Sequence, residues 1–246
     1  MTPARHLRRV GLARALSKLG YCSRARGFRL VRAGRVRVNG SLRTDPESPV
    51  HLEKDRIAVD NQFVQASARV YLMMNKPRGV VTTASDERGR ETVYAYLDKE
   101  LGWVAPVGRL DKASEGLLLL TNDTEWANKI ASPEQQLEKT YHVQVGILAD
   151  EELLARMVRG VRSPGGEVLR VQRAKVLRVG EKNSWIEIVL DEGKNRQIRR
   201  IVEGLGVAVL RLVRVAIGPV VLGKLTTGEV RRLTAEERRA VARHLE

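Results

Sequence analysis

Apolar positions recur along the first forty residues with the period of a helix and then with that of a strand. Four of them share the helical spacing: Leu12, Ala15, Leu16 and Leu19. This spacing predicts an amphipathic helix, and a second helix is expected between Ser23, as its N-cap, and Gly34. Residues 35–38 alternate basic and apolar side chains into an Asn39-Gly40 turn. That pattern predicts a half-buried strand entering a tight hairpin.

The remaining pattern predicts a larger, sheet-based part of the chain. Short strands are expected over residues 51–52 and 57–59, and further strands over 70–74, 80–83, 104–107, 117–120, 140–147, 168–179, 184–190 and 207–217. Helices are expected near Thr92, after Asp123 or Thr124, over 150–158, after Asn195 and after Thr234. Strands and helices that mix without strict alternation predict an α+β fold. Its sheet would be long, mixed and mainly antiparallel, with flanking helices.

The charge of the chain is strongly positive and unevenly placed. The formal net charge is +15, and no acidic residue precedes Asp45. The asymmetry predicts a basic N-terminal module with a polyanionic partner, and nucleic acid is the expected one. The alternative is a surface that is basic throughout, without a specific partner.

Several classes of site and location are disfavoured by what the sequence lacks. A single cysteine, Cys22, excludes an intramolecular disulfide and a cysteine-rich zinc site, and the four histidines have no ligand spacing. We therefore expect no metal. No apolar stretch approaches the ~20 residues of a membrane span, and no secretory signal is evident, so a cytoplasmic protein is expected. The absence of nucleotide-binding and hydrolase motifs favours chemistry by side chains without a cofactor.

Three stretches carry candidate chemistry. The first, VAPVGRLDKASEGLLLLTND, holds Asp111 in a polar loop between two predicted strands, where reactive groups are commonly held. The second, LEKTYHVQV, holds Lys139 and Tyr141, and the third, DEGKNRQIRRIVEGLG, predicts a helix. On that helix Arg199 borders the apolar face, whereas Arg200 is expected to point to solvent. A nucleophilic carboxylate must stay ionised and oriented, and a nearby arginine does both.

The N-terminal run SKLGYCSRARGFRLVRAGRVRVNG resembles the alpha-L RNA-binding domain, first known from a ribosomal small-subunit protein. The resemblance covers about residues 10–60. It implies that two helices and a hairpin form one basic face that docks on structured RNA. Gly11 and Gly27-Phe28 depart from the usual pattern, which leaves the set of RNA contacts open.

The larger part resembles the ribosomal RNA pseudouridine synthases of the RsuA/RluB group. NKPRGVVTT, GRLDKASEGLLLLTND, EKTYHVQV and EGKNRQIRR occur in the expected order between Met74 and Leu233. The resemblance implies the pseudouridine synthase fold and this layout: a basic arm over 1–9, the alpha-L domain over 10–60, a linker over 61–69 and the catalytic domain over 70–246. It implies site-specific conversion of uridine to pseudouridine in ribosomal RNA, with a slight preference for the large subunit.

The same resemblance implies roles for individual residues. Asp111 would be the nucleophile, Tyr141 would pack on the flipped uracil and help remove its carbon-bound proton, and Arg199 would pair with Asp111. Whether Asp111 attacks the sugar or the base first stays open. Further residues are candidates for RNA contacts, some of them as phosphate ligands: Arg24, Arg26, Arg35, Arg37, Lys76, Arg78, Arg109, Lys112, Lys194, Arg196 and Arg200.

Alternatives exist for each assignment. Asp111 could be a turn or N-cap residue, Tyr141 an ordinary strand aromatic, and Arg199 a partner of Glu203 at i, i+4. The competing function is a non-catalytic RNA-binding or ribosome-assembly factor on a synthase fold. No uncovered apolar stripe is evident, so a monomer is the expected oligomeric state.

Overall fold

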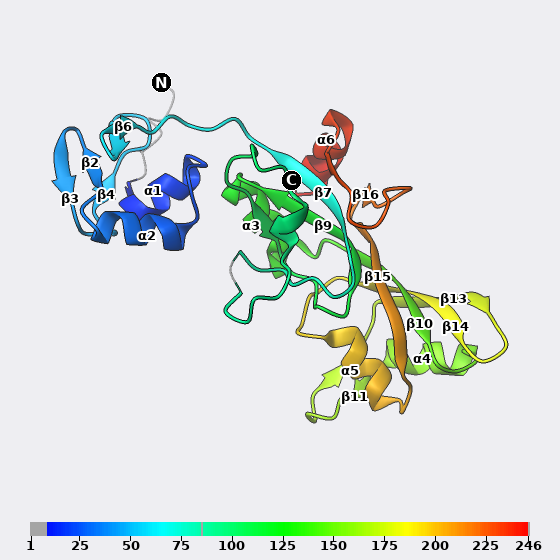
Figure 1. Cartoon of the computed structure of the whole chain (residues 1–246). Helices are drawn as coiled ribbons and strands as arrows, with labels where there is room; N and C mark the ends of the chain where they lie inside the picture. The colour runs from blue at the N-terminus through cyan, green and yellow to red at the C-terminus, as the bar shows by residue number, and fades with distance from the viewer. Residues whose placement is uncertain (1–8, 85, 246) are drawn as a thin grey trace, which may run out of the picture. The chain divides into compact units, whose positions relative to one another are not determined.

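The computed structural model describes residues 9–84 and 86–245 (Figure 1). The basic arm predicted over residues 1–9 therefore lies, apart from Arg9, outside the described residues. The chain forms two compact units. The first runs to Tyr71 and adds Asp98–Ala105 and Leu120–Ala127, and the second contains Leu72–Leu97, Pro106–Leu119 and the chain from Asn128 onward.

Two short helices of the first unit pack closely against each other. They are α1, Leu12–Lys18, and α2, Arg24–Arg32. Ser23 caps α2 as predicted, since its hydroxyl accepts the Arg26 N–H at 3.1 Å. A Cβ at Gly27 would lie 3.0 Å from the carbonyl oxygen of Ala13, so this glycine permits the close helix contact. Phe28 is 43% exposed and lies outside the core.

A four-stranded antiparallel sheet completes the small module. Its order is β3 (Ser41–Arg43), β2 (Val36–Val38), β5 (Ile57–Val59) and β6 (Gln62–Phe63). The predicted hairpin turn is confirmed by the positive φ of Asn39 and Gly40, 50° and 83°. The strand predicted over residues 51–52 is wrong in position, because His51 begins a turn by donating its N–H to Asp55 at 2.7 Å. The strand there is β4, Pro49–Val50, which pairs with β1, Val10–Gly11. β6 lies in the segment predicted as a linker.

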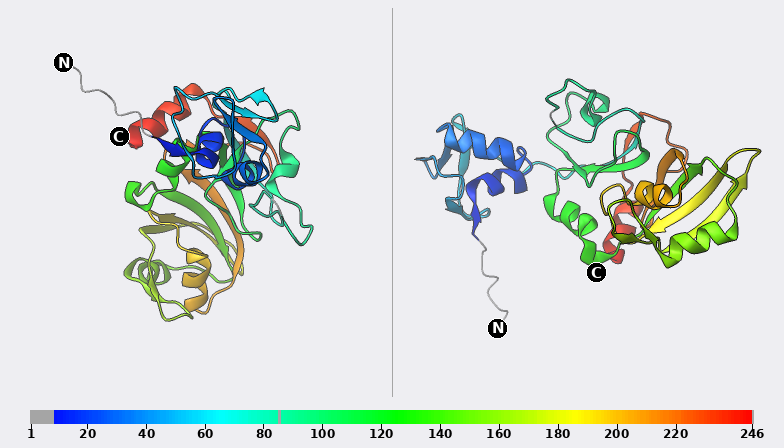
Figure 2. Two further views of the ribbon diagram at one scale, coloured as in Figure 1. Left: turned by 90° about the vertical axis from the view of Figure 1, so that its left-hand side faces the viewer. Right: turned by 90° about the horizontal axis from the view of Figure 1, so that it is seen from below.

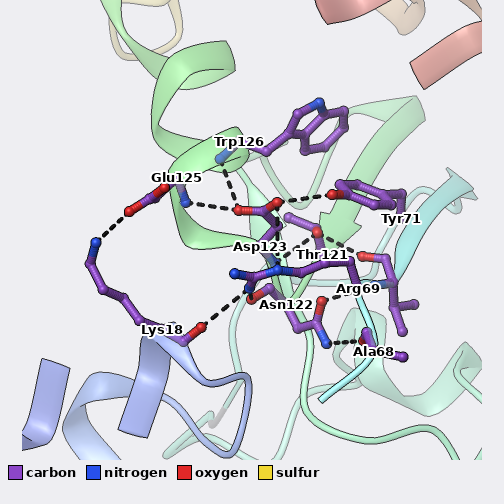
Figure 3. A network of polar contacts seen from close by, with 10 residues as sticks. Lys18, Ala68, Arg69, Tyr71, Thr121, Asn122, Asp123, Glu125 and Trp126 are labelled. Atoms are coloured by element: carbon purple, nitrogen blue, oxygen red, sulfur yellow. Dashed lines mark hydrogen bonds and ion pairs between the residues drawn. The ribbon is translucent and has the colours of Figure 1, made fainter. Parts of the chain in front are cut away.

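A polar network ties the residues before Tyr71 to the start of α3, Thr124–Ala131 (Figure 3). The side chain of Asn122 accepts the Val70 N–H at 2.9 Å and donates to the carbonyl oxygen of Ala68 at 2.8 Å. Asp123 accepts the Tyr71 hydroxyl at 2.9 Å and the Trp126 N–H at 3.1 Å. Asp123 is thus the capping residue of α3, one of the two predicted. Arg69–Asp123 and Lys18–Glu125 ion pairs complete the network.

The main sheet has nine strands, seven of which follow the order β13-β14-β10-β15-β9-β7-β17, with β8 on β9 and β16 on β15. The bounds are β7 Tyr71–Lys76, β8 Ala105–Val107, β9 Glu115–Thr121, β10 Lys139–Val145, β13 Arg173–Val179, β14 Ser184–Leu190, β15 Val209–Ile217, β16 Val220–Val221 and β17 Val230–Arg232. The β15–β9 pairing is parallel, whereas β10 pairs antiparallel with both β14 and β15. The predicted long, mainly antiparallel sheet with flanking helices is confirmed.

Two helices, α4 (Glu151–Arg159) and α5 (Gln197–Gly204), lie beside the strands β10, β14 and β15 (Figure 2). Their apolar sides are buried in one core with these strands. Representative core residues from these five elements are Met157, Ile201, Val143, Ile186 and Leu212. A hairpin of β11 (Val161–Arg162) and β12 (Val168–Leu169) packs beside α5. The remaining helices are α6 (Ala235–His244) and two 3-10 turns, η1 (Val93–Tyr96) and η2 (Pro133–Gln135).

Two further strand predictions are wrong. Residues 80–83 form only the single bridge Val81↔Thr92, and the Thr82 hydroxyl donates instead to the carbonyl oxygen of Leu110 at 2.8 Å. The strand predicted over residues 168–179 is divided into β12 and β13, which belong to different sheets. Among the described helices, none has both the length and the apolar character needed to cross a membrane.

Candidate active site

A cavity of about 680 Å³ in the second unit is lined by residues from all three stretches that the sequence singled out. Asp111 comes from the loop between β8 and β9, Tyr141 from β10, and Arg199 from α5. The structure therefore brings together the three residues predicted as catalytic. Asp111 is accessible from the cavity, since its side chain is 31% exposed.

A buried lysine forms hydrogen bonds that hold the loop of Asp111 in place. Lys76 is 0% exposed, and its ammonium donates hydrogen bonds to the carbonyl oxygens of Pro77 (2.9 Å), Ser114 (2.9 Å) and Asp111 (3.3 Å). The prediction that Lys76 contacts RNA is wrong, because its ammonium is buried and donates its hydrogen bonds to backbone carbonyl oxygens. Burial lowers the pKa of Lys76 to about 8, against a smaller opposing effect of Asp111 and Glu115.

Further hydrogen bonds fix the same loop. The Gly79 N–H donates to the carbonyl oxygen of Lys112 at 2.7 Å, and the Thr82 hydroxyl binds both the carbonyl oxygen and the N–H of Leu110, at 2.8 and 3.3 Å. Within the loop, the Ser114 N–H donates to the carbonyl oxygen of Asp111 at 3.0 Å. The backbone that carries Asp111 is therefore preorganised before any ligand enters.

Two arginines near the start of α5 contact Asp111 or its loop, although the sequence predicted such a contact only for Arg199. Arg199 donates to the carbonyl oxygen of Ala113 at 2.9 Å and to the Ser114 hydroxyl at 3.4 Å. The ion pair with Asp111 comes from Arg196, at 3.7 Å. The prediction thus named the wrong arginine for this pair. The reason is local, because Arg196 precedes the helix with a φ of 49° and does not follow helical periodicity.

The electrostatic surroundings of Arg199 are set by its burial. Burial lowers the pKa of Arg199, the positive charges of Arg196 and Arg78 lower it further, and Asp111 opposes them. The Nε atom of Arg199 is buried and has no hydrogen-bond partner among the residues that the structure describes. Arg199 therefore retains hydrogen-bonding capacity in addition to its bonds to the Asp111 loop.

Tyr141 is placed by the alternation of side chains along β10. Residues 139, 141, 143 and 145 share one face of the strand. Val143 and Val145 are buried in the core, whereas Lys139 and Tyr141 line the cavity. Tyr141 also packs partly against that core. The aromatic ring thus lies where the buried face of the sheet continues into the cavity.

The predicted RNA-contact residues have different environments. Those on the surface are Arg24, Arg26, Arg35, Arg37, Arg78, Arg109, Lys112, Lys194 and Arg196. Of these, Arg109, Lys194 and Arg196 also line the cavity, and Arg35 is paired with Asp60 at 2.5 Å. The prediction that Arg200 points to solvent is wrong, since it binds the Ser163 hydroxyl and Glu167, both at 3.0 Å.

Two cations of the cavity, Lys139 and Arg214, have no role predicted from the sequence. Burial and the charge of Arg214 lower the pKa of Lys139. The sequence did contain a pattern that points to Arg214. This arginine lies two residues after Leu212, which is buried, so the two side chains share one face of the strand. A charged residue at such a position is unusual unless it has a partner.

No group of three or more histidine, cysteine, aspartate or glutamate side chains that could hold a metal occurs in residues 9–84 and 86–245. The side chains that line the cavity include the carboxylates of Asp111 and Glu192, the phenol of Tyr141 and several cations. Such a set suits acid–base or nucleophilic chemistry on a polyanionic substrate.

Comparison with protein families matches both parts of the chain. The family model described as RNA pseudouridylate synthase matches residues 70–203. The chain belongs to the RNA pseudouridylate synthase family. A model of the S4 domain matches residues 10–70, which confirms the alpha-L type of RNA-binding domain. The protein is thus an isomerase that converts uridine in RNA to pseudouridine.

The similarity to known proteins extends over nearly the whole chain. The ribosomal large subunit pseudouridine synthase B of Bacillus subtilis (strain 168) is 37% identical over 238 residues, which are 95% of this chain and 97% of the relative. An uncharacterized RNA pseudouridine synthase of Aquifex aeolicus (strain VF5) is 36% identical, over 93% and 92% of the two chains. A crystal structure of a pseudouridylate synthase has a TM-score of 0.67 at 29% identity, over 94% and 99%. The predicted family and fold are confirmed.

Proposed function

We propose that this synthase isomerises a specific uridine of ribosomal RNA, with a slight preference for the large subunit, and that Asp111 is its nucleophile. The observation that carries the proposal is the Asp111 loop, fixed by Lys76, Thr82 and Arg199 at the wall of a cavity that also contains Tyr141. The names of the relatives from B. subtilis and Haemophilus influenzae support the large subunit.

The proposed chemistry starts with a uridine flipped out of the RNA into the cavity, because its reacting atoms are inaccessible within a stack. Asp111 forms a covalent bond to the nucleotide, the N1–C1′ bond breaks, and the base rotates. C5 then bonds to C1′, and the bond to Asp111 breaks, which releases the free carboxylate. The C5 proton is then lost and N1 gains a proton, so the reaction is an isomerisation. Tyr141 packs on the base and helps remove the C5 proton. Arg196 supports the ionised carboxylate of Asp111, and Arg199 holds the loop.

The two parts of the chain have separate proposed tasks. The domain over residues 10–60 binds structured RNA, residues 61–69 link it to the catalytic domain, and residues 70–246 carry the chemistry. Exposed arginines of the first part, among them Arg24, Arg26 and Arg37, contact phosphates. The enzyme acts in the cytoplasm as a monomer, where ribosomal RNA is its macromolecular partner and no cofactor is needed.

The decisive variant is Asp111→Asn. It keeps the shape of the side chain and removes the nucleophilic charge, so pseudouridine formation should fall below detection while RNA affinity changes by no more than about threefold. Pseudouridines are mapped across ribosomal RNA from cells with the wild-type gene, the variant gene or no gene. The exposed Asp98, which does not line the cavity, supplies the matched control Asp98→Asn and should be fully active.

The same map tests the competing function. A non-catalytic assembly factor would leave every pseudouridine in place when its gene is removed, although ribosome assembly would suffer. One pseudouridine should disappear when the gene is removed. If it returns with the wild-type gene but not with the Asp111→Asn gene, the role as a non-catalytic assembly factor is excluded.

A further inference from the structure

Arg214 is a buried cation that has no ion-pair partner within residues 9–84 and 86–245. Only 6% of the residue is exposed. Its Nε donates to the carbonyl oxygen of Leu117 at 2.8 Å, and its buried Nη2 has no hydrogen-bond partner in the same described part of the chain. Glu115, at the start of the neighbouring strand β9, is paired instead with Arg211, at 2.7 and 2.9 Å. Because an unpaired buried charge is costly, the missing acceptor is expected from a ligand.

The sheet places Arg214 at the centre of the candidate site. On one side it is the cross-strand partner of Tyr141 in the β10–β15 pairing, so the two side chains share a face. On the other side it is the register partner of Gly116, which follows the Asp111 loop. Arg214, Tyr141 and Asp111 all line the same cavity.

Gly116 fixes this arrangement. Its φ is 101°, and a Cβ at this position would lie 2.3 Å from the carbonyl oxygen of Arg214. Only glycine adopts such a conformation at low cost, and only glycine leaves room for the backbone of Arg214. The parallel contact between β9 and β15 therefore holds Arg214 at a fixed distance from the loop of Asp111.

We propose that Arg214 binds the carbonyl oxygens of the flipped uracil and stabilises the negative charge that the base acquires during isomerisation. This proposal rests on the proposed function. When the N1–C1′ bond breaks, its electron pair stays with the base, and the charge spreads to O2 and O4. If the carboxylate first adds to the base, the charge falls on O4 as an enolate. In either order the carbonyl oxygens of uracil become the acceptors that the guanidinium lacks.

A phosphate of the RNA is the other acceptor that a guanidinium could bind. Burial argues for the base. The exposed cations among the residues that line the cavity are Arg109, Lys194 and Arg196, and these can meet phosphates without leaving water. Arg214 shares the face of Tyr141 and is almost fully buried. A neutral base enters such a region at lower cost than a phosphate does.

The test compares Arg214→Ala with the wild-type enzyme in the full-length chain, on the ribosomal RNA fragment that contains the mapped uridine. Single-turnover rate and RNA affinity are measured separately, and thermal unfolding checks that the variant is folded. Groups that stabilise developing charge typically contribute a factor of ~10²–10³ to the rate. We expect a loss of about that size in rate, with RNA affinity changed by no more than about threefold. Arg178→Ala removes an exposed arginine of β13 that does not line the cavity, and its rate should equal that of wild type.

Added guanidinium separates a direct role from a structural one. Truncation to alanine leaves space beside the cavity that a guanidinium ion can occupy, so millimolar guanidinium should restore part of the rate of Arg214→Ala and leave wild type unchanged. If Arg214→Ala does not fold, Arg214→Lys is measured instead. It keeps the charge without the planar pair of donors, and we expect a partial loss of rate at unchanged affinity.

The outcomes are distinct. A loss of affinity at unchanged single-turnover rate would assign Arg214 to a phosphate and overturn the proposal, as would an unchanged rate in the variant. A rate loss that guanidinium does not restore in a folded Arg214→Ala enzyme would make its role structural. Failure of the wild-type enzyme to modify any ribosomal RNA would instead overturn the proposed function itself.

Discussion

Lys76 shows how a single buried charge can organise a reactive loop. Its ammonium holds three carbonyl oxygens, including that of Asp111, and burial lowers its pKa to about 8. Such a group costs desolvation energy, which its hydrogen bonds offset only in part. The side chain has no exposed surface, so it acts on the substrate only through the loop that it positions.

Substitution of Lys76 by methionine should therefore affect turnover and leave RNA binding nearly unchanged. The variant loses three hydrogen bonds at the Asp111 loop, and we expect kcat to fall by a factor of about 10² or more. Lys112→Met is the matched contrast, since Lys112 is exposed on the same loop and should raise KM at nearly constant kcat. Steady-state kinetics on the target RNA fragment measure both. An increase in KM alone for Lys76→Met would refute the positioning role.

The lowered pKa of Lys76 also gives a signed prediction for stability. Between about pH 8 and the ordinary value of 10.5 the unfolded chain holds a proton on this lysine that the folded protein has released. Stability rises with pH wherever the unfolded state binds more protons. The free energy of unfolding of wild type, measured relative to Lys76→Met by urea titration, should therefore increase from pH 8 toward pH 10.5. A decrease over this range would contradict the prediction.

At the scale of elements, the sequence located most helices and strands because their signals are local. Ser23 and Thr234 are N-caps with observed hydrogen bonds, and the Asn39-Gly40 turn has the expected backbone. Residues 80–83 were wrongly predicted as a strand because a β-branched run needs a neighbouring strand, and only one bridge forms there. Long-range pairing partners cannot be read from spacing along one chain.

The same limit applies to the site. The motifs identified Asp111, Tyr141 and Arg199, which do meet at one cavity. They did not reveal that Lys76 is buried, because its burial depends on strand β7 lying under a loop that is distant in sequence. The family resemblance also gave the Asp111 ion pair to Arg199, whereas the pair comes from Arg196, whose position before α5 and positive φ no motif reveals.

The parallel junction between β9 and β15 should be intolerant of any side chain at Gly116. Gly116→Ala adds a Cβ in contact with the backbone of Arg214 and forces alanine into an unfavourable backbone conformation. We expect a destabilisation of roughly 2–4 kcal/mol. Gly102→Ala is the control, because nothing lies within 4 Å of its added Cβ and its φ is not positive. Chemical denaturation measures both, and equal stability of the two variants would show that the junction can shift.

At the scale of the whole molecule, charge is the property most relevant to RNA binding. The net charge is +15, and Asp45 is the first acidic residue of the sequence. Arg24 and Arg26 are exposed on α2, and their side chains form no hydrogen bond or ion pair within residues 9–84 and 86–245. Each phosphate contact contributes about 0.9 to the slope of log affinity against log salt concentration on duplex nucleic acid.

The double variant Arg24→Gln/Arg26→Gln should bind RNA more weakly and with a slope smaller by up to about 2. Binding of the ribosomal RNA fragment is measured at several salt concentrations. Arg173→Gln/Arg178→Gln removes the same charge from the exposed strand β13 and serves as the control. If the two double variants had the same slope as each other, a specific contribution of α2 would be refuted.

The parallel β9–β15 junction also fixes when the enzyme can first act during its own synthesis. Asp111 precedes β9, but the strand that pairs beside it ends only at Ile217. The ribosome adds about 5–20 residues per second, so the partner strand follows Asp111 by roughly 5–20 s. Until then the loop that carries Asp111 belongs to a nascent chain without Arg214 and without the strand that completes the wall of the cavity. Assembly of the cavity therefore cannot precede the synthesis of β15.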